Sequence, residues 1–107
     1  MKLTIMVTGG NGLIGSRIIR ELIRRGEPVV NFDQSSSGFD WMMSASSVTL
    51  YRGDVTNISQ LLEAVKKYKV RRIIHMAALL PPETESRPHY GMMVNIQGTN
   101  NVFEVAR

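Results

Sequence analysis

Three glycines at a spacing of three residues, Gly9, Gly12 and Gly15, are the residues of this chain best suited to holding a ligand. Gly9 allows the chain to reverse, Gly12 leaves room for a pyrophosphate beside the backbone, and Gly15 allows close packing of a helix on a strand. The first N–H groups of that helix lack intrahelical partners and attract an anion. A side chain at Gly12 would fill the phosphate position, and we expect a positive φ there to strain it as well.

An acidic residue follows at the distance that dinucleotide binding requires. Asp33 lies 18 positions after Gly15, at the end of the next apolar run, where a carboxylate accepts hydrogen bonds from the hydroxyls of an adenosine ribose. It would repel a 2′-phosphate, and no arginine follows in residues 34–37, so we expect NAD as the cofactor and NADP is less favoured. A glycine triplet alone would also fit a mobile loop, but the strand before it, the helix after it and Asp33 supply the context.

The elements that must position these residues alternate between strands and helices. The hydrophobic pattern predicts strands at 2–7, 28–32, 48–52 and 70–75 and helices at 12–25, 57–68 and 89–106. Residues 34–47 are expected to form a loop with one short helical turn near 41–43, and residues 77–88 a loop with three prolines. Right-handed crossovers then give an α/β fold, a Rossmann-type doubly wound parallel sheet with strand order 3-2-1-4.

Several local features refine this prediction. Asn57 and Gln60 form a variant of a helix capping box, and Gly98 is expected to be a point of close helix packing. Core positions are expected at apolar residues of the helices and of the fourth strand, among them Leu13, Ile14, Ile73, Ile74, Val94, Val102 and Phe103.

The composition indicates one small domain and excludes several classes of protein. The 107 residues are 43% hydrophobic, contain no cysteine and carry a net charge of +4, so a core is possible and a disulfide framework or thiolate metal site is not. The basic clusters at 24–25 and 66–72 lie at or just beyond predicted helix C-termini, where cations favour the helix dipole, so nucleic-acid binding is not expected. The short apolar N-terminal stretch resembles neither a signal peptide nor a membrane span, which predicts a cytoplasmic protein.

With these residues in hand, the chain resembles the N-terminal part of an extended short-chain dehydrogenase/reductase of the NAD-dependent epimerase/dehydratase family. The resemblance covers nearly the whole chain and rests on Asp33 and on the segments 8–15, 53–55, 75–78 and 94–101. It implies a dinucleotide site at Gly9, Asn11, Gly12, Leu13, Ile14 and Gly15 for the pyrophosphate, Asp33 for the ribose, Asp54 and Val55 for adenine, and Met76, Ala77 and Ala78 under the middle of the cofactor.

The resemblance also implies that Asn95 supports catalytic residues from the helix behind the active site. Simpler interpretations remain open, because Asp54 could cap the following helix and Asn95 could be an ordinary surface residue. His75 is interpreted as a hydrogen-bonded histidine at a strand end with no catalytic role.

The chemistry of the family needs a Tyr-x-x-x-Lys pair, which these residues lack. We therefore expect residues 1–107 to be an incomplete NAD(P)-binding Rossmann domain with no catalytic residue of its own. The parent protein would be an epimerase, dehydratase or reductase that acts on a nucleotide sugar or a similar hydroxyl or keto substrate. A non-catalytic nucleotide-sensing module and a steroid- or flavonoid-type reductase remain alternatives. A sheet that ends at the fourth strand has a bare edge, so a homodimer is also expected.

Overall fold

A four-stranded parallel sheet forms the centre of the computed structural model, which describes residues 3–36, 40–42 and 45–107. The strands are β1 (Thr4–Thr8), β2 (Val29–Asp33), β3 (Val48–Arg52) and β4 (Val70–His75). Their order is β3-β2-β1-β4, and every neighbouring pair is parallel. The predicted fold and strand order are confirmed. Lys2, Ser37 and Met43, on which parts of the predictions fall, lie outside the described residues.

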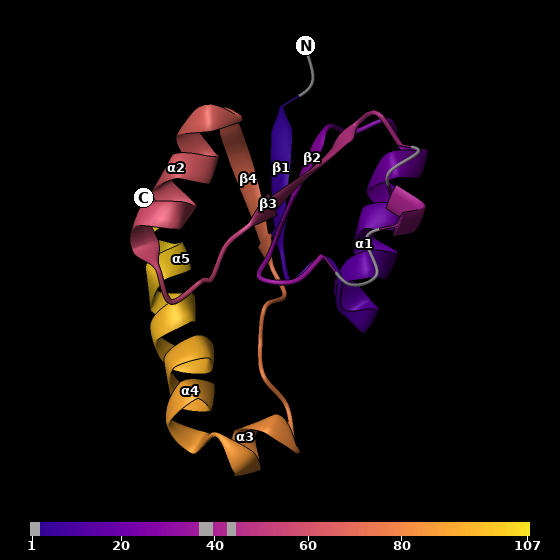
Figure 1. Cartoon of the computed structure of the whole chain (residues 1–107). Coiled ribbons are helices and arrows are strands. Elements are labelled where there is room, and N and C mark those ends of the chain that lie inside the picture. The colour runs from indigo at the N-terminus through magenta and orange to yellow at the C-terminus, as the bar shows by residue number, and fades with distance from the viewer. Residues whose placement is uncertain (1–2, 37–39, 43–44) are drawn as a thin grey trace.

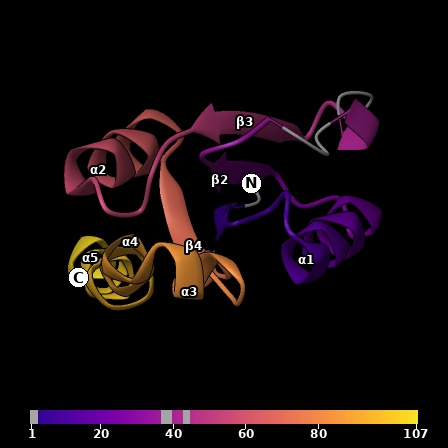
Figure 2. The ribbon, with the colours of Figure 1, turned by 60° about the horizontal axis from the view of Figure 1, so that its bottom comes forward.

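Helices cover both faces of the sheet. The first is α1 (Leu13–Arg24), and after a 3₁₀ turn η1 (Asp40–Met42) comes α2 (Ile58–Lys67). The chain then forms the short helix α3 (Glu83–Ser86) and a long helix of three parts, α4 (Pro88–Met92), the π-helical segment η2 (Met93–Gly98) and α5 (Thr99–Ala106). Helix α1 lies on one face, and α2 with α5 lies on the other, whereas α4 extends below the sheet (Figures 1 and 2).

Alternation along the central strands divides the core into two layers. On the face of α1, Ile5 and Val7 pack with Ile19 of the helix. On the opposite face, Met6 packs with residues from α2 and from the long helix. Successive side chains of a strand point to opposite faces of a sheet, so an apolar run with no polar alternation is what a strand covered on both sides requires.

Five residues that were predicted to lie in the core are exposed or only half-buried. Leu13 and Ile14 are 74% and 58% exposed, because the first turn of α1 projects beyond the carboxyl edge of the sheet. Ile73 and Ile74 are only half-buried, because β4 is an edge strand of the described sheet. Phe103 is 70% exposed although it lies in an apolar helix.

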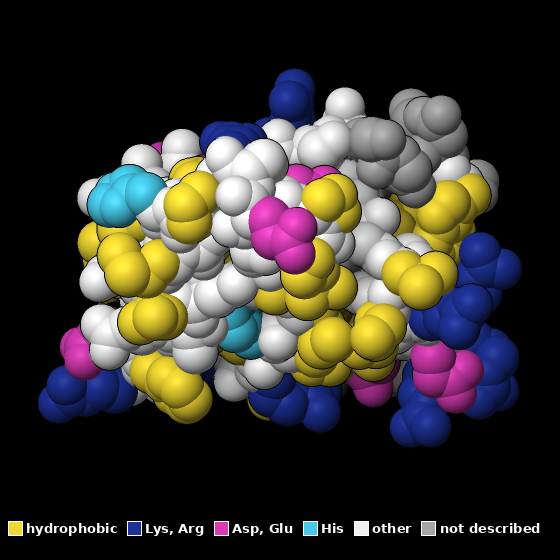
Figure 3. Space-filling model, turned by 90° about the horizontal axis from the view of Figure 1, so that it is seen from below, with side chains coloured by type: hydrophobic (Ala, Val, Ile, Leu, Met, Phe, Trp, Pro, Cys, Tyr) yellow, Lys and Arg dark blue, Asp and Glu magenta, His cyan; other side chains and the backbone are white. Residues whose placement is uncertain are grey.

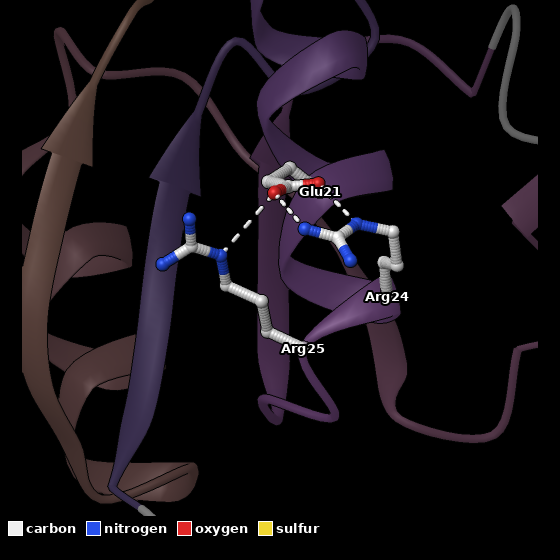
Figure 4. Close-up of polar contacts among 3 residues, drawn as sticks. All are labelled: Glu21, Arg24 and Arg25. Atoms are coloured by element: carbon white, nitrogen blue, oxygen red, sulfur yellow. Dashed lines mark hydrogen bonds and ion pairs between the residues drawn. The ribbon is translucent and has the colours of Figure 1, made fainter.

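Basic side chains lie mainly away from the carboxyl edge of the strands. At the last turn of α1, Glu21 accepts hydrogen bonds from Arg24 Nε at 2.7 Å and Arg25 Nε at 3.3 Å (Figure 4). The hydrogen bond from Arg24, helped by Arg25, lowers the pKa of the Glu21 carboxyl to about 2. Figure 3 looks at the carboxyl edge of the sheet. The centre of this surface consists of hydrophobic and uncharged side chains with an acidic group among them, and most Lys and Arg side chains lie toward its margins. Both basic helix ends lie as the sequence predicted.

The segment after β4 differs from its predicted form. Residues 83–86, expected to be part of a loop, form α3, and the last helix begins at Pro88 rather than at residue 89. Figure 1 shows this segment descending below the carboxyl edge before the long helix returns alongside α2. Gly98 is the point of close packing that the sequence predicted, because a Cβ there would lie 2.6 Å from Val55 Cγ2.

Candidate functional site

The glycine turn between β1 and α1 depends on three different constraints. Gly9 has φ 71°, and a Cβ there would lie 2.8 Å from the backbone N of Ala77. Gly15 packs so closely under Gly9 that a Cβ would collide with the Gly9 carbonyl. Gly12 has φ −75°, so the strain expected there is absent and that part of the prediction was wrong. A Cβ at Gly12 would approach only the Gly9 carbonyl, at 3.3 Å, and faces open space otherwise.

The start of α1 fits a phosphate group. Gly12 is the N-cap and offers no side-chain acceptor to the first N–H groups of the helix. No acidic residue lies in the first turn, so the positive end of the helix dipole is not neutralised there. Backbone that a Cβ would not crowd, next to these donors, is the arrangement that binds a pyrophosphate.

Asp33 ends β2 directly beside this turn. One carboxylate oxygen accepts from the backbone N–H of Asn11 at 3.0 Å, and the other accepts from the N–H of Ser35 at 3.1 Å. Each carboxylate oxygen can accept a further hydrogen bond. The side chain is therefore held at the cavity with acceptor capacity for ribose hydroxyls.

Asn11 uses its side chain to connect the glycine turn to β2. Its Oδ1 accepts from Asn31 Nδ2 at 2.8 Å, and its Nδ2 donates to the carbonyl of Ser35. Asn31 is fully buried, and its Oδ1 has no hydrogen-bond partner among the described residues. A polar residue inside the apolar run 29–33 was a signal for this connection, and our sequence reasoning did not use it.

Asp54 lies in the loop after β3, at the same edge as Asp33. Its Oδ1 accepts from both the N–H and the hydroxyl of Thr56 at 2.9 Å, and its Oδ2 accepts from the hydroxyl of Tyr90 at 2.8 Å. Burial alone would raise the pKa of Asp54, but the hydrogen bonds from Thr56 and Tyr90 outweigh it and leave the pKa below its ordinary value. Asp54 is therefore ionised at neutral pH.

The capping prediction for α2 holds in part. The Asn57 side chain accepts from the Gln60 N–H at 3.2 Å, as predicted. The Gln60 side chain accepts from the backbone N–H of Asp54 at 2.8 Å, whereas in a capping box it would return to the N-cap residue. The start of the helix thus helps to fix the loop that carries Asp54.

A cavity of about 150 Å³ joins these groups at the carboxyl edge. Pockets that enclose a whole ligand are typically about 300–1,000 Å³, so this one can enclose only part of a dinucleotide. It is lined by Gly9, Gly12, Phe32, Asp33, Gln34, Gly53, Asp54, Val55, Met76, Ala77, Ala78, Leu79 and Val94.

The sequence-predicted site residues divide into two groups around this cavity. The two turn glycines, both aspartates, Val55 and residues 76–78 line it, whereas Asn11, Leu13, Ile14, Gly15 and Asn95 do not. Leu13 and Ile14 project from the start of α1 toward solvent. Five lining residues outside the predicted set flank the predicted segments, and that adjacency was the available signal; they are Phe32, Gln34, Gly53, Leu79 and Val94.

Asn95 and His75 connect the long helix to β4 and to the loop that follows it. Asn95 forms two hydrogen bonds with the backbone of Leu79, one to its carbonyl at 2.9 Å and one from its N–H at 2.8 Å. Thr8 Oγ1 accepts from the N–H groups of residues 76 and 77, so its proton is donated to His75 Nδ1 at 2.6 Å. His75 Nε2 then donates to Thr99 Oγ1 at 3.1 Å. Burial lowers the pKa of His75, and both ring nitrogens are bonded, as predicted.

In the parts of the chain that the structure describes, no group of three or more His, Cys, Asp or Glu side chains could hold a metal ion. The same residues contain no helix long and apolar enough to cross a membrane.

Comparison with protein families and curated proteins gives consistent matches along nearly the whole chain. The model of the NAD dependent epimerase/dehydratase family matches residues 5–107. The 3 beta-hydroxysteroid dehydrogenase type 7 of Homo sapiens is 35% identical over 111 residues, covering 96% of this chain and 29% of that protein. UDP-glucose 4-epimerase of Halalkalibacterium halodurans is 33% identical over 104 residues, covering 95% of this chain and 30% of that protein.

Solved structures show the same partial coverage. L-threonine dehydrogenase from Clostridium difficile has a TM-score of 0.84 at 30% identity, over 98% of this chain and 33% of that chain. UDP-glucose 4-epimerase from Thermus thermophilus, in complex with NAD, has a TM-score of 0.82 at 27% identity, over 96% and 33% respectively. The chain spans about a third of the length of these relatives.

Proposed function

The chain belongs to the NAD dependent epimerase/dehydratase family, and from this membership we propose that residues 1–107 form the N-terminal NAD-binding Rossmann domain of an oxidoreductase-type enzyme. The parent enzyme would be an epimerase, dehydratase or reductase acting on a nucleotide sugar or a similar small molecule with a hydroxyl or keto group. Relatives named as a UDP-glucose epimerase and a hydroxysteroid dehydrogenase support the wider substrate class.

The observation that carries the proposal is the convergence of three features on one cavity. The uncrowded backbone at Gly12 and the free end of α1 receive the pyrophosphate, the Asp33 carboxylate receives the ribose hydroxyls, and the loop at Asp54 receives the base. They end neighbouring strands β1, β2 and β3 in that spatial order. A bound nicotinamide supplies a hydride acceptor and donor, and these residues bind and orient the cofactor that carries it.

Proton transfer is proposed to belong to residues outside this chain. A tyrosine that takes a proton from a substrate hydroxyl needs a lowered pKa. Among the described residues, Tyr90 is the tyrosine bonded to cavity-lining side chains, and burial together with the Asp54 carboxylate raises its pKa. That direction is opposite to the one catalysis needs.

The proposal is tested by titrating NAD and NADP into the purified chain by calorimetry. NAD is expected to bind more tightly, because Asp33 accepts from a ribose 2′-hydroxyl and repels a 2′-phosphate. Asp33→Ala should lower the affinity for NAD by about tenfold or more, because a hydrogen bond to a charged group is lost. It should also narrow the difference in affinity between NAD and NADP.

Glu104→Ala is the matched control, because it removes one negative charge from an exposed position on α5. Its cofactor preference should equal that of the wild type. Tighter binding of NADP by the wild-type chain would contradict the assignment of Asp33, and no binding of either dinucleotide would contradict the proposed function.

A further inference from the structure

Tyr90 connects three segments that are distant in the sequence. Its hydroxyl oxygen lies 2.8 Å from Asp54 Oδ2 in the loop after β3 and 2.8 Å from Gln34 Oε1 in the loop after β2. Tyr90 itself lies in α4, the part of the long helix below the carboxyl edge (Figure 1). The Arg87 guanidinium carbon Cζ lies 4.3 Å from the centroid of the Tyr90 ring, and the ring packs against the core layer that contains Met6. The hydroxyl is thus aimed at the cavity rim.

The hydrogen positions follow from counting donors. A phenol has one proton, and an ionised carboxylate accepts more strongly than an amide, so Tyr90 donates to Asp54. Because the orientation of an amide is assigned from its partners, the Gln34 amide is then turned so that its Nε2, in place of its Oε1, faces the hydroxyl. In this orientation Gln34 donates a hydrogen bond to the hydroxyl oxygen. Thr56 occupies Asp54 Oδ1 with two bonds. The carboxylate is fixed in orientation, and its Oδ2 retains capacity for one more donor.

The sheet order places the base of a bound dinucleotide next to this oxygen. In the proposed function, the pyrophosphate lies after β1 and the ribose after β2. The next strand outward is β3, and the loop that follows it carries Asp54. A base that extends from the ribose away from the pyrophosphate therefore meets Asp54 Oδ2.

We propose that Tyr90 is a specificity-determining positioning residue for the base of the dinucleotide. By holding Asp54 Oδ2 toward the cavity, it presents an acceptor to the exocyclic amine of adenine. The same oxygen disfavours hypoxanthine, which carries a carbonyl where adenine carries the amine. This inference rests on the proposed function and concerns Tyr90, which does not line the cavity and acts through Asp54.

The test compares NAD with nicotinamide hypoxanthine dinucleotide by calorimetry on the purified chain and its variants. Wild type is expected to prefer NAD by about tenfold or more, one hydrogen bond to a carboxylate. Tyr90→Phe keeps the ring and removes the hydroxyl. The affinity for NAD should therefore fall by about five- to tenfold, while the affinity for the hypoxanthine analogue should change by less than about twofold. The preference should nearly disappear.

Tyr51→Phe is the matched control. Tyr51 also donates its hydroxyl to a carboxylate, Glu63 Oε1 at 2.7 Å, but this exposed pair joins β3 to α2 and does not line the cavity. Its preference for NAD should equal that of the wild type. A general loss of stability would affect both variants, whereas the proposed role affects Tyr90 alone.

The outcomes separate this inference from the proposed function. Equal weakening of both dinucleotides by Tyr90→Phe, or no change, would overturn the inference and leave the proposed function standing, as would a wild type without preference. If the wild type binds neither dinucleotide, both the inference and the proposed function are refuted. If Tyr90→Phe does not fold, Asp54→Asn tests the same oxygen. Its amide offers a donor, so the preference should shift toward the hypoxanthine analogue, and an unchanged preference would refute the inference.

Discussion

Replacing Asn31 by valine should make the domain more stable while weakening its hold on the cofactor. Asn31 is completely buried in β2 between the glycine turn and Met42, and its Oδ1 lacks a partner among the described residues. An unpaired buried carbonyl costs about 1–3 kcal/mol, and the hydrogen bond from Asn31 to Asn11 contributes about 0.5–1.5 kcal/mol. Asn11 is only partly buried, so water can replace that bond.

The balance favours the variant by about 1 kcal/mol, which raises the melting temperature of a domain of this size by about 4–8 °C. Valine also suits the interior of a strand better than asparagine. Because Asn11 loses the contact that fixes the turn to β2, the affinity for NAD should fall. Thermal melts and calorimetry on the same samples measure both effects.

The matched comparison is Asn101→Val. Asn101 is also buried, but both ends of its amide are bonded, to the Val55 carbonyl at 2.9 Å and to Gln97 Nε2 at 2.9 Å. Valine and asparagine have similar helix propensities, so this variant isolates the lost bonds and should be destabilised by about 1–3 kcal/mol. If Asn31→Val melts below the wild type, or if both variants shift alike, the reasoning about the unpaired oxygen is refuted.

Three further predictions follow from the same structure. Gly12→Val should fold, because its φ is ordinary, but should lose NAD in calorimetry; retained affinity would mean that the turn does not approach the phosphates. The 107-residue chain should form dimers through the free edge of β4 and show no NAD turnover, and a stable monomer with turnover in sedimentation and activity assays would contradict this. Burial lowers the pKa of His75 below its ordinary value of 6.5, so below about pH 6.5 the unfolded chain binds a proton that the folded chain does not. The free energy of unfolding measured with urea should therefore be constant above about pH 6.5 and should decline as the pH falls below it. In His75→Gln this decline should flatten, and equal declines in both proteins would exclude His75 as the cause.

The parts of the fold set by local pattern could be predicted from the sequence. The third and fourth strands were predicted at 48–52 and 70–75 and have those bounds, because short apolar runs between turn residues leave little choice of structure. The glycine turn was predictable for the same reason, since a residue with φ 71° whose Cβ would meet backbone must be glycine.

The contacts that complete the site could not be predicted in this way. The bond from Tyr90 to Asp54 joins residues 36 positions apart, and that from Asn11 to Asn31 joins residues 20 positions apart. Such pairs depend on how loops of neighbouring strands converge, which periodicity does not encode. The prediction that Ile73, Ile74 and Phe103 are fully buried was wrong for a similar reason, because an apolar residue is buried only where another element covers it.

The π-helical segment η2 sets the rotational phase between the two ends of the long helix. Each residue advances an α-helix by about 100°, and a π-type turn inserts one extra residue into that progression. If residues 93–98 instead formed a regular α-helix, with no residue deleted, α4 would turn by roughly a quarter of a revolution relative to α5. Val102 would stay on the sheet, but the Tyr90 hydroxyl would point away from Asp54. The widened turn thus acts as an angular spacer between the sheet-packing end of the helix and the end that reaches the cavity rim.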